Sequence, residues 1–89
     1  MYSSKRYLGS NQLLTSVSNK EIIPDAPSNW TMGYELSNFS IMNYDDCTLV
    51  INDIELFLKS NQGFSTDIGT TVSVKIKEDG IQYNWIGAY

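Results

Sequence analysis

The sequence ends in a segment, residues 81–89 (IQYNWIGAY), that alternates large apolar side chains with mostly polar ones. In an extended strand, Ile81, Tyr83 and Trp85 lie on one face and the intervening side chains lie on the other. A segment with one Trp and two Tyr is costly to leave in water, and a chain end frays unless something holds it. We therefore expect a strand packed into a sheet or against a partner, which favours a β-rich structural or binding protein.

The clearest local pattern is a pair of apolar runs, residues 47–51 and 54–59, separated by Asn52-Asp53. Asn and Asp tolerate the positive φ of a type I′ turn, so the pattern predicts a tight β-hairpin. Alternation in the second run predicts three inward side chains and one outward contact candidate: Ile54, Leu56 and Leu58 inward, and Phe57 outward.

Further segments combine period-two alternation with β-branched or aromatic residues and are predicted strands: residues 12–18, 20–23, 30–36, 39–42, 64–67 and 70–77. For residues 12–23 a helix is the alternative, disfavoured by the β-branched and Ser content. In residues 70–77, Val72, Val74 and Ile76 are expected to point inward, and Asp79-Gly80 to turn the chain back as a hairpin into residues 81–89. No segment shows sustained helical periodicity. The pattern predicts an all-β fold, a small antiparallel β-sandwich or barrel of about seven to eight short strands. Residues 1–10 are expected to form an extended N-terminal arm or edge strand, and residues 11–89 a single β domain.

Charge and hydropathy narrow the classes of partner. Six Lys and Arg against ten Asp and Glu give a net charge of −4, without the basic stripe that a nucleic acid requires. Residues 1–6 lack the apolar core of a signal peptide, and no apolar run approaches the roughly 20 residues of a membrane span. We expect a protein made in a cytoplasm that binds neither nucleic acid nor membrane.

The residues needed for catalysis are scarce. Histidine is absent, and Cys47, beside an apolar run, is predicted to be a buried filler. The carboxylates of Asp45-Asp46 with Asp53 or Asp25 lack the spacing of a calcium loop and are interpreted as turn residues. The expectation is a protein that is not an enzyme and has no metal or cofactor.

Aromatic residues are the remaining functional signal. Two Trp, six Tyr and three Phe accompany abundant Asn and Ser, a composition that suits both sugar-binding surfaces and protein interfaces. Most rings are expected in the core (Trp30, Tyr34, Tyr83 and Trp85). The contact candidates are Tyr2, Tyr7, Tyr44, Phe57 and Tyr89, with Lys5 and Arg6 in the arm reaching an acidic neighbour.

Three stretches carry a family resemblance: IIPDAPSNW (residues 22–30), NYDDCTLVINDIELFLKSNQGFSTD (residues 43–67) and VSVKIKEDGIQYNWIGAY (residues 72–89). They resemble small structural proteins of tailed bacteriophages of Gram-positive bacteria, in which such a hairpin precedes an NQGF segment and the chain closes on YNWIG. The resemblance covers about two thirds of the chain.

This resemblance implies a virion component assembled in the host cytoplasm, as a capsid decoration (cement) protein or a tail or neck component. Its partners would be a major capsid or tail protein and copies of itself. Apart from the resemblance, the predicted hairpin leaves residues 87–89 beyond the end of their partner strand, where they are expected to form a contact tail. The alternative is a carbohydrate-binding module at a tail tip that contacts the host cell wall. A small inhibitor or regulator of a host enzyme is a third interpretation.

Overall fold

The computed structural model describes residues 6–10, 12–26, 28–30, 33–67 and 69–89. The described residues form two antiparallel sheets and no helix, so the all-β prediction is confirmed. None of the described segments forms a helix that could span a membrane.

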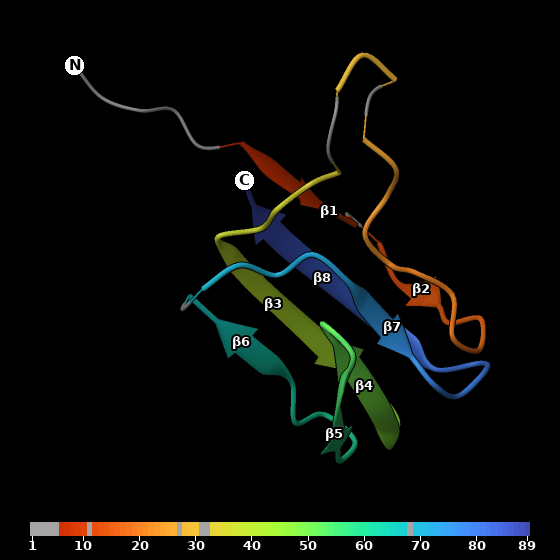
Figure 1. Cartoon of the computed structure of the whole chain (residues 1–89). Coiled ribbons are helices and arrows are strands. Elements are labelled where there is room, and N and C mark those ends of the chain that lie inside the picture. The colour runs from red at the N-terminus through yellow and green to blue at the C-terminus, as the bar shows by residue number, and fades with distance from the viewer. Residues whose placement is uncertain (1–5, 11, 27, 31–32, 68) are drawn as a thin grey trace.

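The larger sheet, sheet A, has β8 (Gln82–Ala88) and β3 (Asn38–Asn43) at its centre, side by side in Figure 1. Beyond β3 lies β6 (Phe64–Thr66), while β1 (Tyr7–Gly9) and β2 (Leu14–Thr15) pair with successive parts of β8 on its other side. The N-terminal segment therefore contributes an edge strand. Sheet B has the order β5 (Ile54–Leu58), β4 (Cys47–Ile51), β7 (Val74–Ile76).

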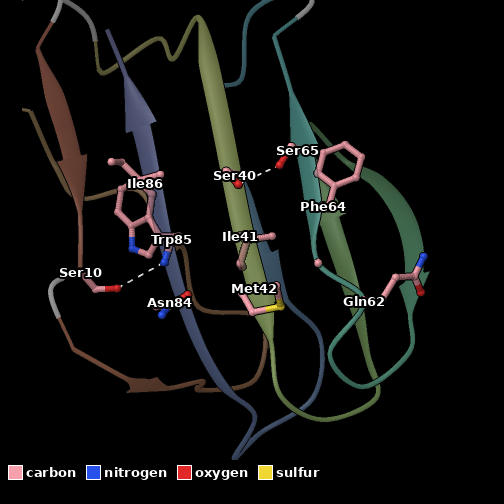
Figure 2. Close-up of a pocket in the computed structure, with 11 residues that line it drawn as sticks. Ser10, Ser40, Ile41, Met42, Gln62, Phe64, Ser65, Asn84, Trp85 and Ile86 are labelled. Atoms are coloured by element: carbon pink, nitrogen blue, oxygen red, sulfur yellow. Dashed lines mark hydrogen bonds between the residues drawn. The ribbon is translucent and has the colours of Figure 1, made fainter.

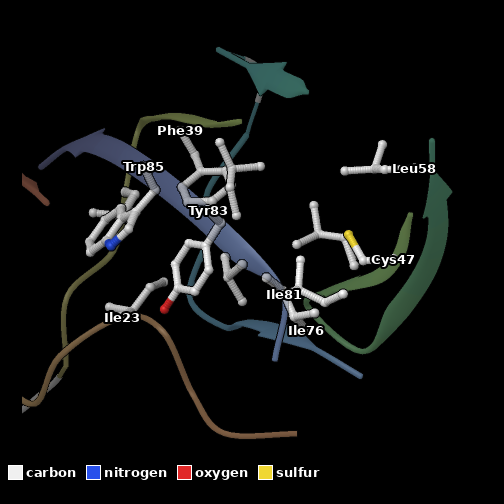
Figure 3. Packing of buried hydrophobic residues seen from close by; sticks show 12 residues of the cluster. Ile23, Phe39, Cys47, Leu58, Ile76, Ile81, Tyr83 and Trp85 are labelled. Atoms are coloured by element: carbon white, nitrogen blue, oxygen red, sulfur yellow. The ribbon is translucent and has the colours of Figure 1, made fainter. Parts of the chain in front are cut away.

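Alternation along the strands places apolar side chains from both sheets in one core (Figure 3). Phe39 and Trp85 come from sheet A, and Leu49 and Ile76 come from sheet B. The predicted inward face of residues 81–85 is confirmed, because Ile81, Tyr83 and Trp85 are all buried. Cys47 is also buried, as predicted, and burial foremost, followed by nearby carboxylates, raises the pKa of its thiol to about 11.

The predicted hairpin at Asn52-Asp53 is confirmed, with φ of 48° and 67° at the two turn residues. Its inward pattern is only partly right, because Leu58 is buried but Ile54 and Leu56 are exposed. The register places both on the core side of sheet B, opposite Ile51 and Leu49. They are uncovered because β5 is an edge strand, and Val72, also predicted inward, is exposed as well.

The hairpin predicted at Asp79-Gly80 is wrong. Gly80 does turn, with φ of 80°, but β7 pairs with β4 in one sheet and β8 pairs with β1, β2 and β3 in the other. Ser16 takes the position of the expected partner: its N–H donates to the Ile81 carbonyl (2.7 Å) and its carbonyl accepts from Gly80 N–H (2.9 Å). Its hydroxyl donates to the Glu78 carbonyl (2.8 Å) and accepts from Ile81 N–H (2.9 Å). The connection therefore crosses between sheets.

Three other predicted strands are shorter or absent. The described part of residues 30–36 is irregular, and only Leu36 forms a bridge, with Thr71. Residues 12–18 contain the two-residue β2, and residues 20–23 contribute a single bridge between Glu21 and Lys75.

The expected overhang at residues 87–89 is also wrong. Gly87 and Ala88 are buried within β8, where they pair with β1 on one side and with β3 on the other. Tyr89 continues the pairing, because its N–H donates to the Arg6 carbonyl (2.9 Å) and its carbonyl accepts from Arg6 N–H (3.2 Å).

Candidate interaction surfaces

The outer face of sheet A carries an open hollow, shown in Figure 2 and called here the outer-face hollow. Its floor comes from β3 and β8, and one wall comes from residues 62–65. The residues that line it are Ser10, Ser40, Ile41, Met42, Gln62, Gly63, Phe64, Ser65, Asn84, Trp85 and Ile86. None of these carries a charge, so the hollow favours neutral groups.

Period-two alternation produces this mixed surface. Core residues of β3 alternate with Ser40 and Met42, which face outward, and Ile86 lies beside Ser40 on the neighbouring strand. The hydroxyl groups of Ser40 and Ser65 share a hydrogen bond of 2.8 Å across β3 and β6 (Figure 2). The Ser10 hydroxyl accepts a hydrogen bond from the backbone N–H of Trp85 at 3.3 Å. A second hollow adjoins the first, shares Ser40, Ser65 and Ile86 with it, and extends it to Tyr7.

Asn43 holds the loop that forms the wall of the outer-face hollow. It is fully buried (0% exposed), and its side-chain N–H groups donate to the carbonyls of Asp45 (2.9 Å) and Lys59 (2.8 Å). Its side-chain oxygen accepts from the N–H of Gly63 (2.9 Å). One amide thus ties the end of β3 to the turn before β4 and to the loop after β5, with its side-chain groups satisfied.

Three rings form a cluster beside the last strand. The Tyr34 and Tyr89 ring centroids lie 4.7 Å apart, and Trp30 lies 5.0 Å from Tyr34 and 5.9 Å from Tyr89. The ring planes meet at 58–70°, so this cluster does not offer coplanar faces. Burial, and then the neighbouring Tyr89 hydroxyl, raise the pKa of Tyr34.

The edge strand β5 is another candidate interaction surface, and its exposed side chains are mostly apolar. Ile54 is 71% exposed, Leu56 38% and Phe57 58%. Glu55 forms an ion pair with Lys77 (3.0 Å) on the outer face of sheet B. The strand therefore presents apolar side chains on both faces, with its one charge compensated within the chain.

The predicted contact residues are divided among these surfaces. Tyr7 is exposed (68%) at the second hollow, and Phe57 is exposed on β5. Arg6 is exposed, whereas Tyr89 is half-buried in the ring cluster. Tyr2 and Lys5 lie outside the described residues. Alternation alone did not single out Ile54, Leu56 or Ile86 as contacts, because their exposure depends on which strands become edges and which face is covered.

Carboxylates in the turns serve local structure. The Glu78 carboxylate accepts a hydrogen bond from the Thr48 N–H at 2.7 Å. Burial acts to raise the pKa of Glu78, but the hydrogen bonds from Thr48, the backbone N–H of Glu78 and the charge of Lys77 together outweigh it, so the net pKa is lowered. Asp46 accepts from the Ser60 N–H (2.7 Å). Within the described part of the chain, no three His, Cys, Asp or Glu residues lie close enough to hold a metal ion.

A comparison with known proteins found no matching family, no similar curated protein and no similar solved structure.

Proposed function

We propose that this chain is a non-catalytic structural subunit of a phage particle that acts by multivalent protein–protein contacts. The observation that carries the binding role is the presence of two separate surfaces with exposed apolar side chains on one small domain: the outer face of sheet A, with Tyr7 and Ile86, and the edge strand β5. Contiguous exposed apolar surface is characteristic of interaction sites. Two such surfaces allow one copy to contact two neighbours at once, so weak contacts add up over an assembly.

The phage assignment rests on the resemblance of residues 22–30, 43–67 and 72–89 to small structural proteins of tailed phages. In that setting the chain is a capsid decoration protein or a tail or neck component, assembled in the host cytoplasm. Its partners are a major capsid or tail protein and further copies of itself. Without a bound metal or cofactor in this role, affinity comes from burial of apolar and aromatic side chains such as Tyr7 and Ile86.

Purified virions test this proposal. Mass spectrometry is expected to detect the chain at many copies per particle, and cryo-electron microscopy to locate it on the head or tail. The Ile86→Asp variant, which introduces a charge into the neutral outer face, is expected to reduce incorporation about tenfold or more. The matched control Val72→Asp changes an exposed apolar residue that lines neither hollow on sheet A. Virions that lack the protein would refute the proposal.

A second candidate function, glycan binding at a tail tip, is favoured by the neutral lining of the outer-face hollow. Hydroxyl and amide groups of Ser10, Ser65, Gln62 and Asn84 line the hollow together with Ile86, and such groups bind sugar hydroxyls. A glycan array tests it, with Asn84→Ala expected to abolish any signal. Uniform background binding across the array would reject this candidate.

A further inference from the structure

We propose that two copies of this chain pair antiparallel through their β5 edges, about a two-fold axis at Leu56, to make one continuous six-stranded sheet from two copies of sheet B. The inference deepens the proposed function, because it names a partner and a register for one of the two exposed surfaces. It is carried by the hydrogen-bonding groups, the side chains and the charges of residues 53–59.

The other sheet edges are short or covered. The far edge of β7 is occupied by residues 19–22: Asn19 N–H donates to the Ile76 carbonyl (2.9 Å) and Ile22 N–H to the Val74 carbonyl (2.8 Å). The Glu21 carboxylate accepts from Val74 N–H (2.6 Å). β1, β2 and β6 have only three, two and three residues. β5 has five residues, without the proline or lysine that usually protects an edge.

The hydrogen bonds of β4 show which backbone groups of β5 are available. Lys77 N–H donates to the Thr48 carbonyl and Asn52 N–H to the Ser73 carbonyl, so alternate residues of β4 point toward β7. The backbone groups of the remaining β4 residues, such as Leu49, point toward β5. They bond to every second residue of β5: Ile54, Leu56 and Leu58. The N–H and C=O groups of Glu55 and Phe57 therefore point outward, and no described residue bonds to them.

These groups select one register. With the axis at Leu56, Glu55 of one copy lies opposite Phe57 of the other, and both pairs exchange their N–H and C=O groups. An axis at Glu55 would set two carboxylates opposite each other. An axis at Phe57 would require the N–H of Lys59, which already donates to the Gln62 side-chain oxygen at 2.8 Å.

The side chains and charges fit the same register. Leu56 of one copy lies opposite Leu56 of the other, and Ile54 of one copy lies opposite Leu58 of the other. The pairing therefore brings together the apolar side chains of Ile54 and Leu56, which are exposed in the isolated chain. At each end of the paired strands the exposed Asp53 of one copy lies opposite the exposed Lys59 of the other. This charge complementarity between identical edges favours a second copy over a partner of different sequence.

Cysteine cross-linking tests the register. In the proposed pair the two Leu56 residues form a non-hydrogen-bonded pair with Cα atoms about 4.5 Å apart, within disulfide reach. Under mild oxidation, Leu56→Cys is expected to give at least about ten times more disulfide-linked dimer than Phe57→Cys, whose copies are displaced by roughly 7 Å along the strands. The native Cys47 is buried and is present in both variants, so it serves as an internal control.

Sedimentation equilibrium tests the edge itself. Phe57→Pro removes an outward N–H that β4 does not use, whereas the control Phe57→Thr retains it. Proline is expected to weaken self-association at least about tenfold relative to threonine. Equal association of the two variants, equal cross-linking of the two cysteine variants, or a monomer up to about millimolar concentration would overturn the inference. A monomer that still enters virions would refute this pairing alone, whereas a dimer that virions lack would refute the proposed function alone.

Discussion

Replacing Asn43 tests whether one buried amide holds the loop beside the outer-face hollow. Asn43→Ala removes three hydrogen bonds of 2.8–2.9 Å. Each such bond contributes about 1 kcal/mol net, so the free energy of unfolding should fall by about 3 kcal/mol. This is a large part of the roughly 5–15 kcal/mol that stabilises a typical domain.

Asn43→Asp gives a sharper result because it changes charge and donors at nearly constant shape. The introduced carboxylate keeps the bond from Gly63 N–H but faces the carbonyls of Asp45 and Lys59 without a proton to donate. Burial against two carbonyl oxygens must raise the pKa of this group above the unfolded value. A raised carboxyl pKa gives a penalty that is absent below the unfolded pKa, grows as the pH rises above that value, and levels off above the folded pKa.

Urea unfolding of the wild type, Asn43→Ala and Asn43→Asp between pH 4 and pH 8 measures both effects. The difference in unfolding free energy between Asn43→Asp and Asn43→Ala should change by more than about 1 kcal/mol in favour of the alanine variant as the pH rises. Ser37→Ala is a control, because Ser37 is an exposed polar residue that directly precedes the other end of β3. If Asn43→Ala costs less than about 1 kcal/mol, or the aspartate variant shows no pH dependence relative to it, the reasoning is refuted.

Three further predictions concern other parts of the fold. Removing residues 87–89 is expected to lower the free energy of unfolding by at least about 3 kcal/mol, because β8 loses its pairing on both sides; normal thermal stability would contradict this. Gly9→Ala would place a Cβ 2.5 Å from the Trp85 carbonyl oxygen, so β1 must move away from β8. Amide hydrogen exchange measured by NMR is expected to become faster in β1, and unchanged exchange would contradict this prediction. The lowered pKa of Glu78 gives stability that is present above the ordinary carboxyl pKa of 4.5 and is lost as the pH falls through the folded value. Glu78→Gln should therefore lose less stability than the wild type between pH 6 and pH 3 in urea unfolding, and parallel pH profiles would refute the role of the Thr48 bond.

Local patterns predicted the parts of the fold that local interactions determine. The hairpin at Asn52-Asp53 follows from two residues that accept positive φ, and the inward face of residues 81–85 follows from period-two alternation. The predicted strand at residues 30–36 failed although its alternation is regular. Its described aromatic residues, Trp30 and Tyr34, pack ring against ring with Tyr89, so alternation there reflects a side-chain cluster and not a sheet face.

The Asp79-Gly80 turn shows why pairing partners were not predictable. A local turn signal fixes where the chain reverses, but it does not decide which strand accepts the hydrogen bonds after the reversal. Here Ser16, more than 60 residues away, supplies both backbone and side-chain partners to the segment from Glu78 to Ile81. A serine in a short polar run carries no sequence signal for this role.

The same distinction explains the candidate surfaces. Alternation was enough to place Phe57 on the outside of its strand, but the availability of its backbone groups depends on β4 pairing with β7 on the other side. Residues 19–22 then cover the far edge of β7, so sheet B has one protected edge and one exposed edge. An exposed edge with apolar residues on both faces invites pairing with a second strand. The Phe57→Pro and Phe57→Thr comparison measures whether copies of the chain use this edge.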